Sequence, residues 1–117
     1  MKKLLIVDDE ESLINLFINR FSKEYEIHSA VNGAEAVKKC TKEKFDFVML
    51  DVVMPVLDGI EAAKAIKICQ QDVKIAIMTG NPNATNMEKI KYVNIDLFIE
   101  KPFMLEDVGR EIKRLLG

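Results

Sequence analysis

The sequence predicts an α/β fold: a doubly wound, five-stranded parallel sheet of strand order 2-1-3-4-5, with five helices in a three-layer sandwich. Two observations carry this prediction. Short β-type runs alternate with segments of helical spacing along the whole chain, which is typical of parallel sheets with right-handed helical crossovers. Three of the runs are continuously apolar, as expected of strands that are buried on both faces.

The expected strands follow from these runs. Leu4–Val7, Phe47–Leu50 and Ile75–Met78 are continuously apolar and are assigned to the centre of the sheet. The second run is more polar and is expected at an edge. With flanking residues included, the predicted strands are Lys3–Val7, Glu26–Val31, Phe45–Leu50, Lys74–Met78 and Leu97–Glu100.

Helices are predicted where apolar residues recur three or four positions apart. Asn32 precedes Glu35 by three residues, the spacing of a capping box, and marks the start of the second helix. Asp58 and Glu61 mark the start of the third in the same way. Asn81–Val93 has the weakest pattern, and we expect a short helix there. The apolar positions are Leu13, Leu16, Phe17 and Phe21; Ala36, Val37 and Cys40; Ile60, Ala63, Ile66 and Cys69; Met87, Ile90 and Val93; and Leu105, Val108, Ile112, Leu115 and Leu116.

Composition limits the possible functions. A chain of 117 residues suits one domain, residues 1–117, and a net charge of −2 argues against direct nucleic-acid binding. No apolar run approaches the roughly 18 residues that span a bilayer, so no membrane contact is expected. The amino-terminal residues lack a signal peptide's longer apolar core. Cys40 and Cys69 have no metal-ligand spacing and are expected to be reduced thiols, buried or half-buried, in a cytoplasmic protein.

Polar and charged residues follow the expected strands. Asp8 and Asp9 come after the first strand and Asp51 after the third, while Thr79 follows the fourth and Lys101 the fifth. In a doubly wound sheet, ligands bind outside the carboxyl ends of the strands at the switch point, here between strands one and three. Taken singly, the residues have ordinary explanations. Asp8 and Asp9 suit a helix start, and Lys101 suits solvent. Together they predict a site.

This set of residues favours phosphoryl chemistry on a divalent cation. Adjacent carboxylates repel each other, and Mg²⁺ relieves that repulsion because it takes carboxylate and phosphate oxygens as ligands. Asp51 can act as a nucleophile toward phosphorus. Phosphoryl transfer mainly needs positioning and neutralisation of the phosphoryl oxygens, which Lys101 and the Thr79 hydroxyl would supply beside the cation. An ionised aspartate requires no general base.

Over its full length the chain resembles the receiver domain of two-component response regulators. The matching segments, in order, are "LLIVDDE", "DFVMLDVVMPVLDG", "IAIMTG" and "FIEKPF". The resemblance implies that Asp51 is the phosphoacceptor for a phosphoryl group from a kinase phosphohistidine. It implies that Asp8, Asp9, Asp51 and the backbone carbonyl of Val53 bind Mg²⁺.

The resemblance also implies how the signal is passed on. Thr79 and Phe98 occupy the family's switch positions, and Lys101 precedes Pro102 in what the family usually builds as a cis bond. Phosphorylation would draw Thr79 toward the phosphoryl oxygens, turn Phe98 inward and change the surface of helix four, strand five and helix five. For Phe98 alone, simple core packing is the competing interpretation. Val53 and Asn81 are expected to tune the lifetime of the phosphoryl group, which Val53 should lengthen because it cannot orient a water molecule.

The expected partners are a sensor histidine kinase or a histidine phosphotransfer protein, and a downstream protein or an output domain in a longer chain. Ile14 and Ile18 either widen the buried face of the first helix or form an exposed patch for the phosphodonor. His28 is interpreted as a surface residue. The sheet order also suits a flavin-binding module, but that class needs a Ser/Thr/Gly-rich loop after the first strand. A phosphatase of the haloacid-dehalogenase type would carry its nucleophile on the first strand in an Asp-x-Asp pattern, and residue 10 here is Glu.

Overall fold

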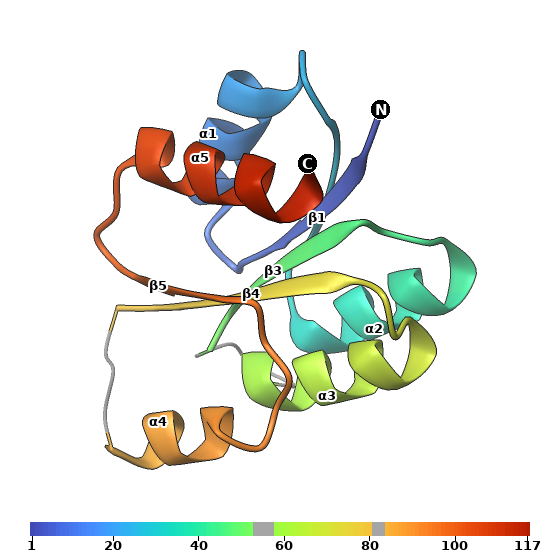
Figure 1. Cartoon of the computed structure of the whole chain (residues 1–117), viewed down its shortest axis with the longest axis vertical. Helices are drawn as coiled ribbons and strands as arrows, with labels where there is room; N and C mark the ends of the chain where they lie inside the picture. The colour runs from blue at the N-terminus through green and yellow to red at the C-terminus, as the bar shows by residue number, and fades with distance from the viewer. Residues whose placement is uncertain (53–57, 81–83) are drawn as a thin grey trace.

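The computed structural model describes residues 1–52, 58–80 and 84–117. Within these residues the chain alternates between strand and helix, with the ten elements labelled in Figure 1. They are β1 (Lys3–Val7), α1 (Glu11–Phe21), β2 (Glu26–Ala30), α2 (Gly33–Lys42), β3 (Phe47–Asp51), α3 (Gly59–Cys69), β4 (Lys74–Thr79), α4 (Ala84–Ile90), β5 (Leu97–Glu100) and α5 (Leu105–Leu116).

All four strand pairs are parallel, and the order β2-β1-β3-β4-β5 confirms the predicted topology. The more polar β2 lies at one edge, as expected, and β5 lies at the other. Two strands run further than the sequence predicted, because β3 includes Asp51 and β4 includes Thr79. These polar residues therefore belong to the sheet's hydrogen-bonded ladder, with Asp51 opposite Met78 and Thr79 opposite Glu100.

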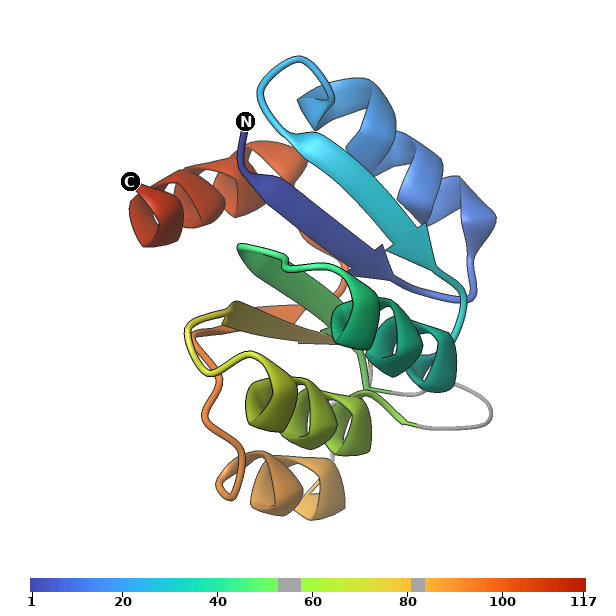
Figure 2. The same ribbon diagram turned by 90° about the vertical axis from the view of Figure 1, so that its right-hand side faces the viewer.

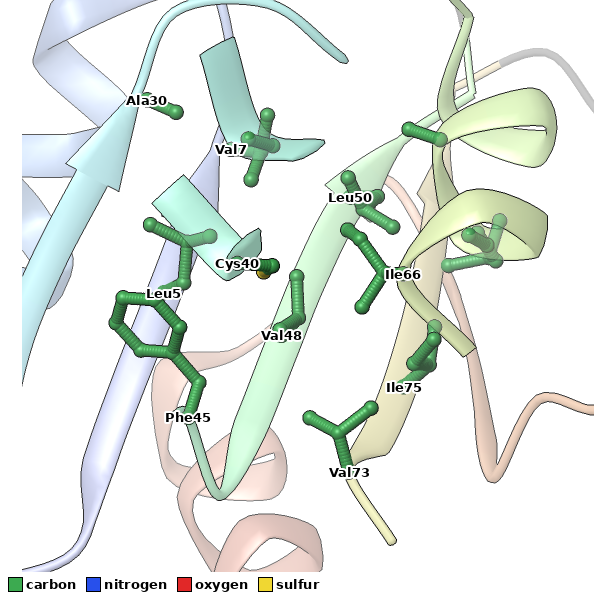
Figure 3. Packing of buried hydrophobic residues seen from close by; sticks show 14 of the residues in the cluster. Leu5, Val7, Ala30, Cys40, Phe45, Val48, Leu50, Ile66, Val73 and Ile75 are labelled. Atoms are coloured by element: carbon green, nitrogen blue, oxygen red, sulfur yellow. The ribbon is translucent and has the colours of Figure 1, made fainter. Parts of the chain in front are cut away.

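Helices cover both faces of the sheet, so the molecule has three layers. Helices α1 and α5 lie on one face, and α2, α3 and α4 lie on the other (Figures 1 and 2). Side chains of each strand alternate between the two faces. Leu4 and Ile6 of β1 join the core under α1 and α5, whereas Leu5 and Val7 join the core under α2 and α3. Figure 3 shows the second of these cores, where Val48 and Leu50 face Ile66 of α3.

Helix α1 buries most of the predicted face: Phe17 and Phe21 are buried and Leu13 packs against the core. The core residues are Ile14, Phe17 and Phe21, and Leu16 is 51% exposed, so the expectation for Leu16 was wrong. The structure also decides between the two interpretations of Ile14, which is core. Six of the nine residues from position 13 to 21 are apolar, so their spacing fits more than one buried face of the helix. Packing against the sheet decides which face is buried.

Predicted helix starts are confirmed by hydrogen bonds. The Asn32 side chain accepts from the Glu35 backbone N–H at 2.8 Å, and Asp58 accepts from the Glu61 backbone N–H at 2.9 Å. These side chains satisfy amide groups that have no partner within the helix. Helix α4 is short, as its weak apolar pattern predicted.

Two aspartates at the amino end of the sheet hydrogen-bond to the backbone of neighbouring strands. Asp46 accepts a hydrogen bond from the Lys3 backbone N–H at 2.8 Å, and its own N–H donates to the Lys3 carbonyl at 2.8 Å. Asp96 repeats the arrangement with Ile75, at 2.9 and 2.8 Å. Each aspartate thus completes the backbone hydrogen bonding of a neighbouring strand just where that strand begins.

Both cysteines are free thiols, but in different environments. Cys40 is buried in α2, and loss of solvent raises the pKa of its thiol to about 12, with smaller contributions from Cys69 and Glu43. Cys69 is exposed at the end of α3, so the expectation that both would be buried or half-buried was wrong for this residue. Among the described residues, no helix is long and apolar enough to cross a membrane.

Candidate functional site

The predicted acidic residues meet at the carboxyl ends of β1 and β3. Asp8 is fully buried, and its backbone N–H donates to the Ala30 carbonyl of β2 at 3.1 Å. One carboxylate oxygen of Asp8 accepts from the Glu10 backbone N–H at 2.8 Å. Asp9 is exposed. Asp51 ends β3 and is 7% exposed, so its carboxylate lies at the mouth of the site.

Lys101 joins two of these carboxylates. Its ammonium lies 3.1 Å from a carboxylate oxygen of Asp8 and 3.1 Å from one of Asp51. Burial alone lowers the pKa of the ammonium, but the hydrogen bonds and negative charges of Asp8 and Asp51 outweigh it, so the pKa lies above its ordinary value. The bond between Lys101 and Pro102 is cis, as the resemblance implied.

The three carboxylates can share one metal ion. Oxygens of Asp8, Asp9 and Asp51 lie within 4.8 Å of one another, a spacing that one divalent cation can bridge. A set of carboxylate oxygens suits Mg²⁺, which keeps several waters and usually takes only one or two protein carboxylates beside phosphate oxygens. The expected ligand Val53, like Asn81, lies outside the described residues.

Thr79 and Phe98 lie on the same face of the sheet. Phe98 is paired with Ile77, and Ile77 and Thr79 share a face because they are two residues apart on β4. Thr79 is fully buried, and its carbonyl accepts from the Lys101 backbone N–H at 2.7 Å. Phe98 is half-buried and packs against the core under α2 and α3. The two predicted switch residues are therefore diagonal neighbours on adjacent strands.

An apolar groove of about 490 Å³ adjoins the acidic residues. It lies between α1 and the segment that leads from β5 to α5, and Lys101 forms part of its wall. Its lining residues are Leu13, Leu16, Gly80, Lys101, Pro102, Phe103 and Leu105. For Ile14 and Ile18 the sequence left open either a wider buried face or an exposed apolar patch. The structure favours the buried face, because Ile14 is buried and Ile18 packs against the core. The residues of α1 that line the groove are Leu13 and Leu16.

A second groove, of about 520 Å³, lies along β5 and the first half of α5. Most of its lining is apolar, from Leu97–Ile99, Pro102–Met104 and Val108, and Glu100, Asp107 and Glu111 form its acidic part. It includes strand five and helix five of the surface that the resemblance assigned to signalling. Phe98, one of the two predicted switch residues, therefore also borders this surface groove.

Comparison with known proteins agrees with this geometry. The family model for the response regulator receiver domain matches residues 4–113. The chain belongs to this family. It is therefore a receiver domain of two-component signal transduction, with a role in signalling.

Relatives of the receiver span two architectures. The chain is 37% identical to the chemotaxis protein CheY of Halobacterium salinarum, covering 98% of this chain and 97% of that protein. It is 35% identical to the alkaline phosphatase synthesis transcriptional regulatory protein PhoP of Bacillus subtilis, over 98% of this chain but 48% of the relative. The receiver thus spans about half the length of that regulator and nearly all of the chemotaxis protein.

Solved structures support the fold. A CheY-like receiver domain protein from Methanospirillum hungatei superposes with a TM-score of 0.95 at 25% identity, covering 99% of this chain and 94% of that one.

The sequence had predicted Asp8, Asp9, Asp51, Thr79 and Lys101 as site residues, and the structure brings them to one edge of the sheet. It had missed the roles of Asp46 and Asp96, although both stand directly before an apolar strand.

Proposed function

We propose that Asp51 of this receiver accepts a phosphoryl group from a phosphohistidine, in a reaction that the receiver assists with its own residues. The observation that carries the proposal is the position of Lys101, 3.1 Å from the carboxylates of both Asp8 and Asp51. A fixed cation beside an ionised nucleophile supplies the charge neutralisation that phosphoryl transfer needs.

In this step a carboxylate oxygen of Asp51 forms a bond to phosphorus while the phosphorus–nitrogen bond of the phosphohistidine breaks. The imidazole nitrogen keeps the electron pair of that bond and takes up a proton. Lys101 neutralises the growing negative charge on the phosphoryl oxygens, and the Thr79 hydroxyl donates to one of them. Asp8 holds Lys101 from the other side, so the ammonium keeps its place as Asp51 changes partner.

Asp8, Asp9 and Asp51 would hold the Mg²⁺ ion, together with the predicted carbonyl ligand of Val53. Support comes from the donor set itself, because oxygens of the three carboxylates lie within 4.8 Å of one another. When bound, the ion would neutralise phosphoryl oxygens during transfer. The same carboxylates without a cation would repel an incoming phosphoryl group.

Phosphorylation would be transmitted from Thr79 to Phe98. Their diagonal placement on β4 and β5 supports this, since a shift of the Thr79 side chain changes the space beside Phe98. Phe98 also lines the groove along β5 and α5, so its movement would alter the surface of α4, β5 and α5 that a downstream protein or output domain contacts. A shift between two existing states is sufficient for such a switch.

The donor would be a sensor histidine kinase or a histidine phosphotransfer protein. The apolar groove between α1 and the β5–α5 connection supports this assignment, because it would bind an apolar helix face directly beside Lys101. We further propose that residues 1–117 form one receiver domain and that it works in the cytoplasm, where free thiols such as Cys69 stay reduced.

The test is the intact mass of the protein after incubation with phosphoramidate, with and without Mg²⁺. We expect a gain of one phosphoryl group that needs Mg²⁺ and is absent from an Asp51→Asn variant. A gain that persists in the variant would move the acceptor to another residue. No gain under any condition would overturn the proposal.

A further inference from the structure

Gly59, the first residue of α3, lies directly against the backbone of Asp51. A Cβ atom at position 59 would stand 2.1 Å from the Asp51 carbonyl oxygen, 2.8 Å from its carbonyl carbon and 3.1 Å from the Cα of Val52. Side-chain carbons in proteins keep at least 3.0 Å from such atoms. Because the neighbours are backbone atoms, the overlap cannot be relieved by turning a flexible side chain.

Neither partner in this contact can easily move away. The Gly59 backbone N–H donates to the Val52 carbonyl at 3.1 Å, and the Val52 N–H donates to the Met78 carbonyl of β4 at 3.0 Å. Helix α3 is anchored in the core by side chains that are at most 1% exposed. They are Ile60, Ala62, Ala63 and Ile66. A helix that retreated from Asp51 would have to open this core, which is costly.

We infer that Gly59 is a positioning residue for Asp51, an inference that rests on the proposed function of that carboxylate. Its lack of a side chain lets the first turn of α3 press on the peptide between Asp51 and Val52. That contact fixes where the Asp51 carboxylate stands relative to Lys101 and Asp8. A methyl group at position 59 would displace the peptide by about 1 Å, and a misplacement of that size can slow a reaction about 100-fold.

Gly109 offers a matched control. A Cβ atom there would stand 2.9 Å from the ring of Phe21, so the position is crowded as well. The crowding involves a side chain, and Phe21 ends α1 near the amino end of the sheet, away from Asp51. Gly80 is less informative, because a Cβ atom there would make only ordinary contacts, at 3.7 and 3.9 Å, with the Lys101 side chain.

The experiment compares Gly59→Ala with Gly109→Ala in the full chain. Phosphoryl uptake from phosphoramidate is followed against donor concentration by intact mass, and Mg²⁺ affinity is measured by calorimetry. Rates are divided by the folded fraction from circular dichroism, with trimethylamine N-oxide added to keep both variants folded. We expect Gly59→Ala to lower the maximal rate about 10- to 100-fold, with a smaller change in half-saturating donor concentration, and to weaken Mg²⁺ binding. Gly109→Ala should leave both unchanged.

A wild-type rate and Mg²⁺ affinity in folded Gly59→Ala would overturn the inference, as would equal losses in the two variants. Failure of the proposed function is distinguishable, because the wild-type protein would then take up no phosphoryl group. Mg²⁺ affinity would still decide the inference in that case. Weaker binding confined to Gly59→Ala supports it, and equal binding in wild type and variant contradicts it.

Discussion

The two ends of the parallel sheet use aspartate in opposite ways. At the amino end, Asp46 and Asp96 each exchange two hydrogen bonds with the backbone of a neighbouring strand. At the carboxyl end, the carboxylates of Asp8, Asp9 and Asp51 converge, and Lys101 bridges two of them. Aspartate is therefore structural where its closest partners are backbone groups, although Lys67 lies 3.9 Å from Asp96, and is proposed to be reactive where several charges converge.

This difference follows from the geometry of parallel strands. At the amino end, strands present N–H groups that lack a partner, and an aspartate can satisfy them directly. At the carboxyl end, side chains from different loops meet near the switch point, and their charges must be balanced by a cation or a ligand. The largest effects of substitution should accordingly appear as lost chemistry at one end and as lost stability at the other.

The sharpest test of the carboxyl end is Lys101→Met. Removing the ammonium leaves Asp8 and Asp51 without their shared cation, and the rate of phosphoryl uptake should fall by about 100- to 1,000-fold. Intact mass against time measures this rate. Lys91→Met is the matched control, because Lys91 is exposed and pairs with Glu88 across one turn of helix. Equal rates for Lys101→Met and the control would contradict the assigned role.

At the amino end, Asp46→Ala should cost about 1–3 kcal/mol in the free energy of unfolding, because the part-buried Lys3 N–H loses its acceptor. Asp96→Ala should lower the free energy of unfolding by a similar amount, because the Ile75 backbone N–H loses its acceptor. Urea unfolding followed by circular dichroism measures both. In each variant the phosphoryl uptake per folded molecule should match wild type. A variant that unfolds normally but reacts slowly would break the contrast between the two ends.

Gln70 follows α3 and binds the backbone that connects α2 to the amino end of β3. Its side-chain amide donates to the carbonyls of Cys40 and Glu43, at 2.8 and 2.7 Å, and accepts from the Phe45 N–H at 2.9 Å. Gln70→Ala should lower the free energy of unfolding by about 1 kcal/mol, since water can replace part of this bonding. Equal unfolding midpoints in urea for the variant and the wild type would show that these bonds contribute nothing net.

The smallest effect is expected at the exposed ion pair between α1 and α5. Hydrogen bonding to Arg20, and then its charge, lowers the pKa of Glu106. A carboxyl whose pKa is lower in the folded state stabilises the protein above its unfolded pKa and loses that contribution as pH falls through the folded value. The free energy of unfolding of wild type should therefore slightly exceed that of Glu106→Gln at neutral pH. The difference should shrink as pH falls below the ordinary pKa of glutamate, about 4.3, and through the lower pKa of the folded state. A difference that grows in acid would contradict this pairing.

The sequence predicted much of the carboxyl end, and for a physical reason. Continuous apolar runs locate the central strands, and the charged residues that follow them must meet at one edge. Asp51 and Lys101, 50 residues apart, could be brought together on that argument alone. For α1 the sequence left the roles of Ile14 and Ile18 open and wrongly placed Leu16 on the buried face, because the spacing of Leu13, Ile14 and Leu16 fits more than one helical face.

Other features depend on contacts that a linear pattern does not contain. The closeness of Gly59 to Asp51 is set by how α3 packs on the sheet, and the sequence shows only an Asp-Gly pair at a helix start. Asp46 and Asp96 did leave a signal, since each precedes an apolar strand directly. Their acceptor role became visible only when the register placed them opposite the start of a neighbouring strand.

One measurement tests the contrast most directly: phosphoryl uptake per folded molecule, with Mg²⁺, in Asp51→Asn and Asp46→Asn side by side. Both substitutions remove one carboxylate charge and keep the side-chain size. We predict no phosphoryl gain for Asp51→Asn and a wild-type gain for Asp46→Asn. A phosphoryl gain in Asp51→Asn, or its loss in folded Asp46→Asn, would contradict the assignment of chemistry to the carboxyl end of the sheet.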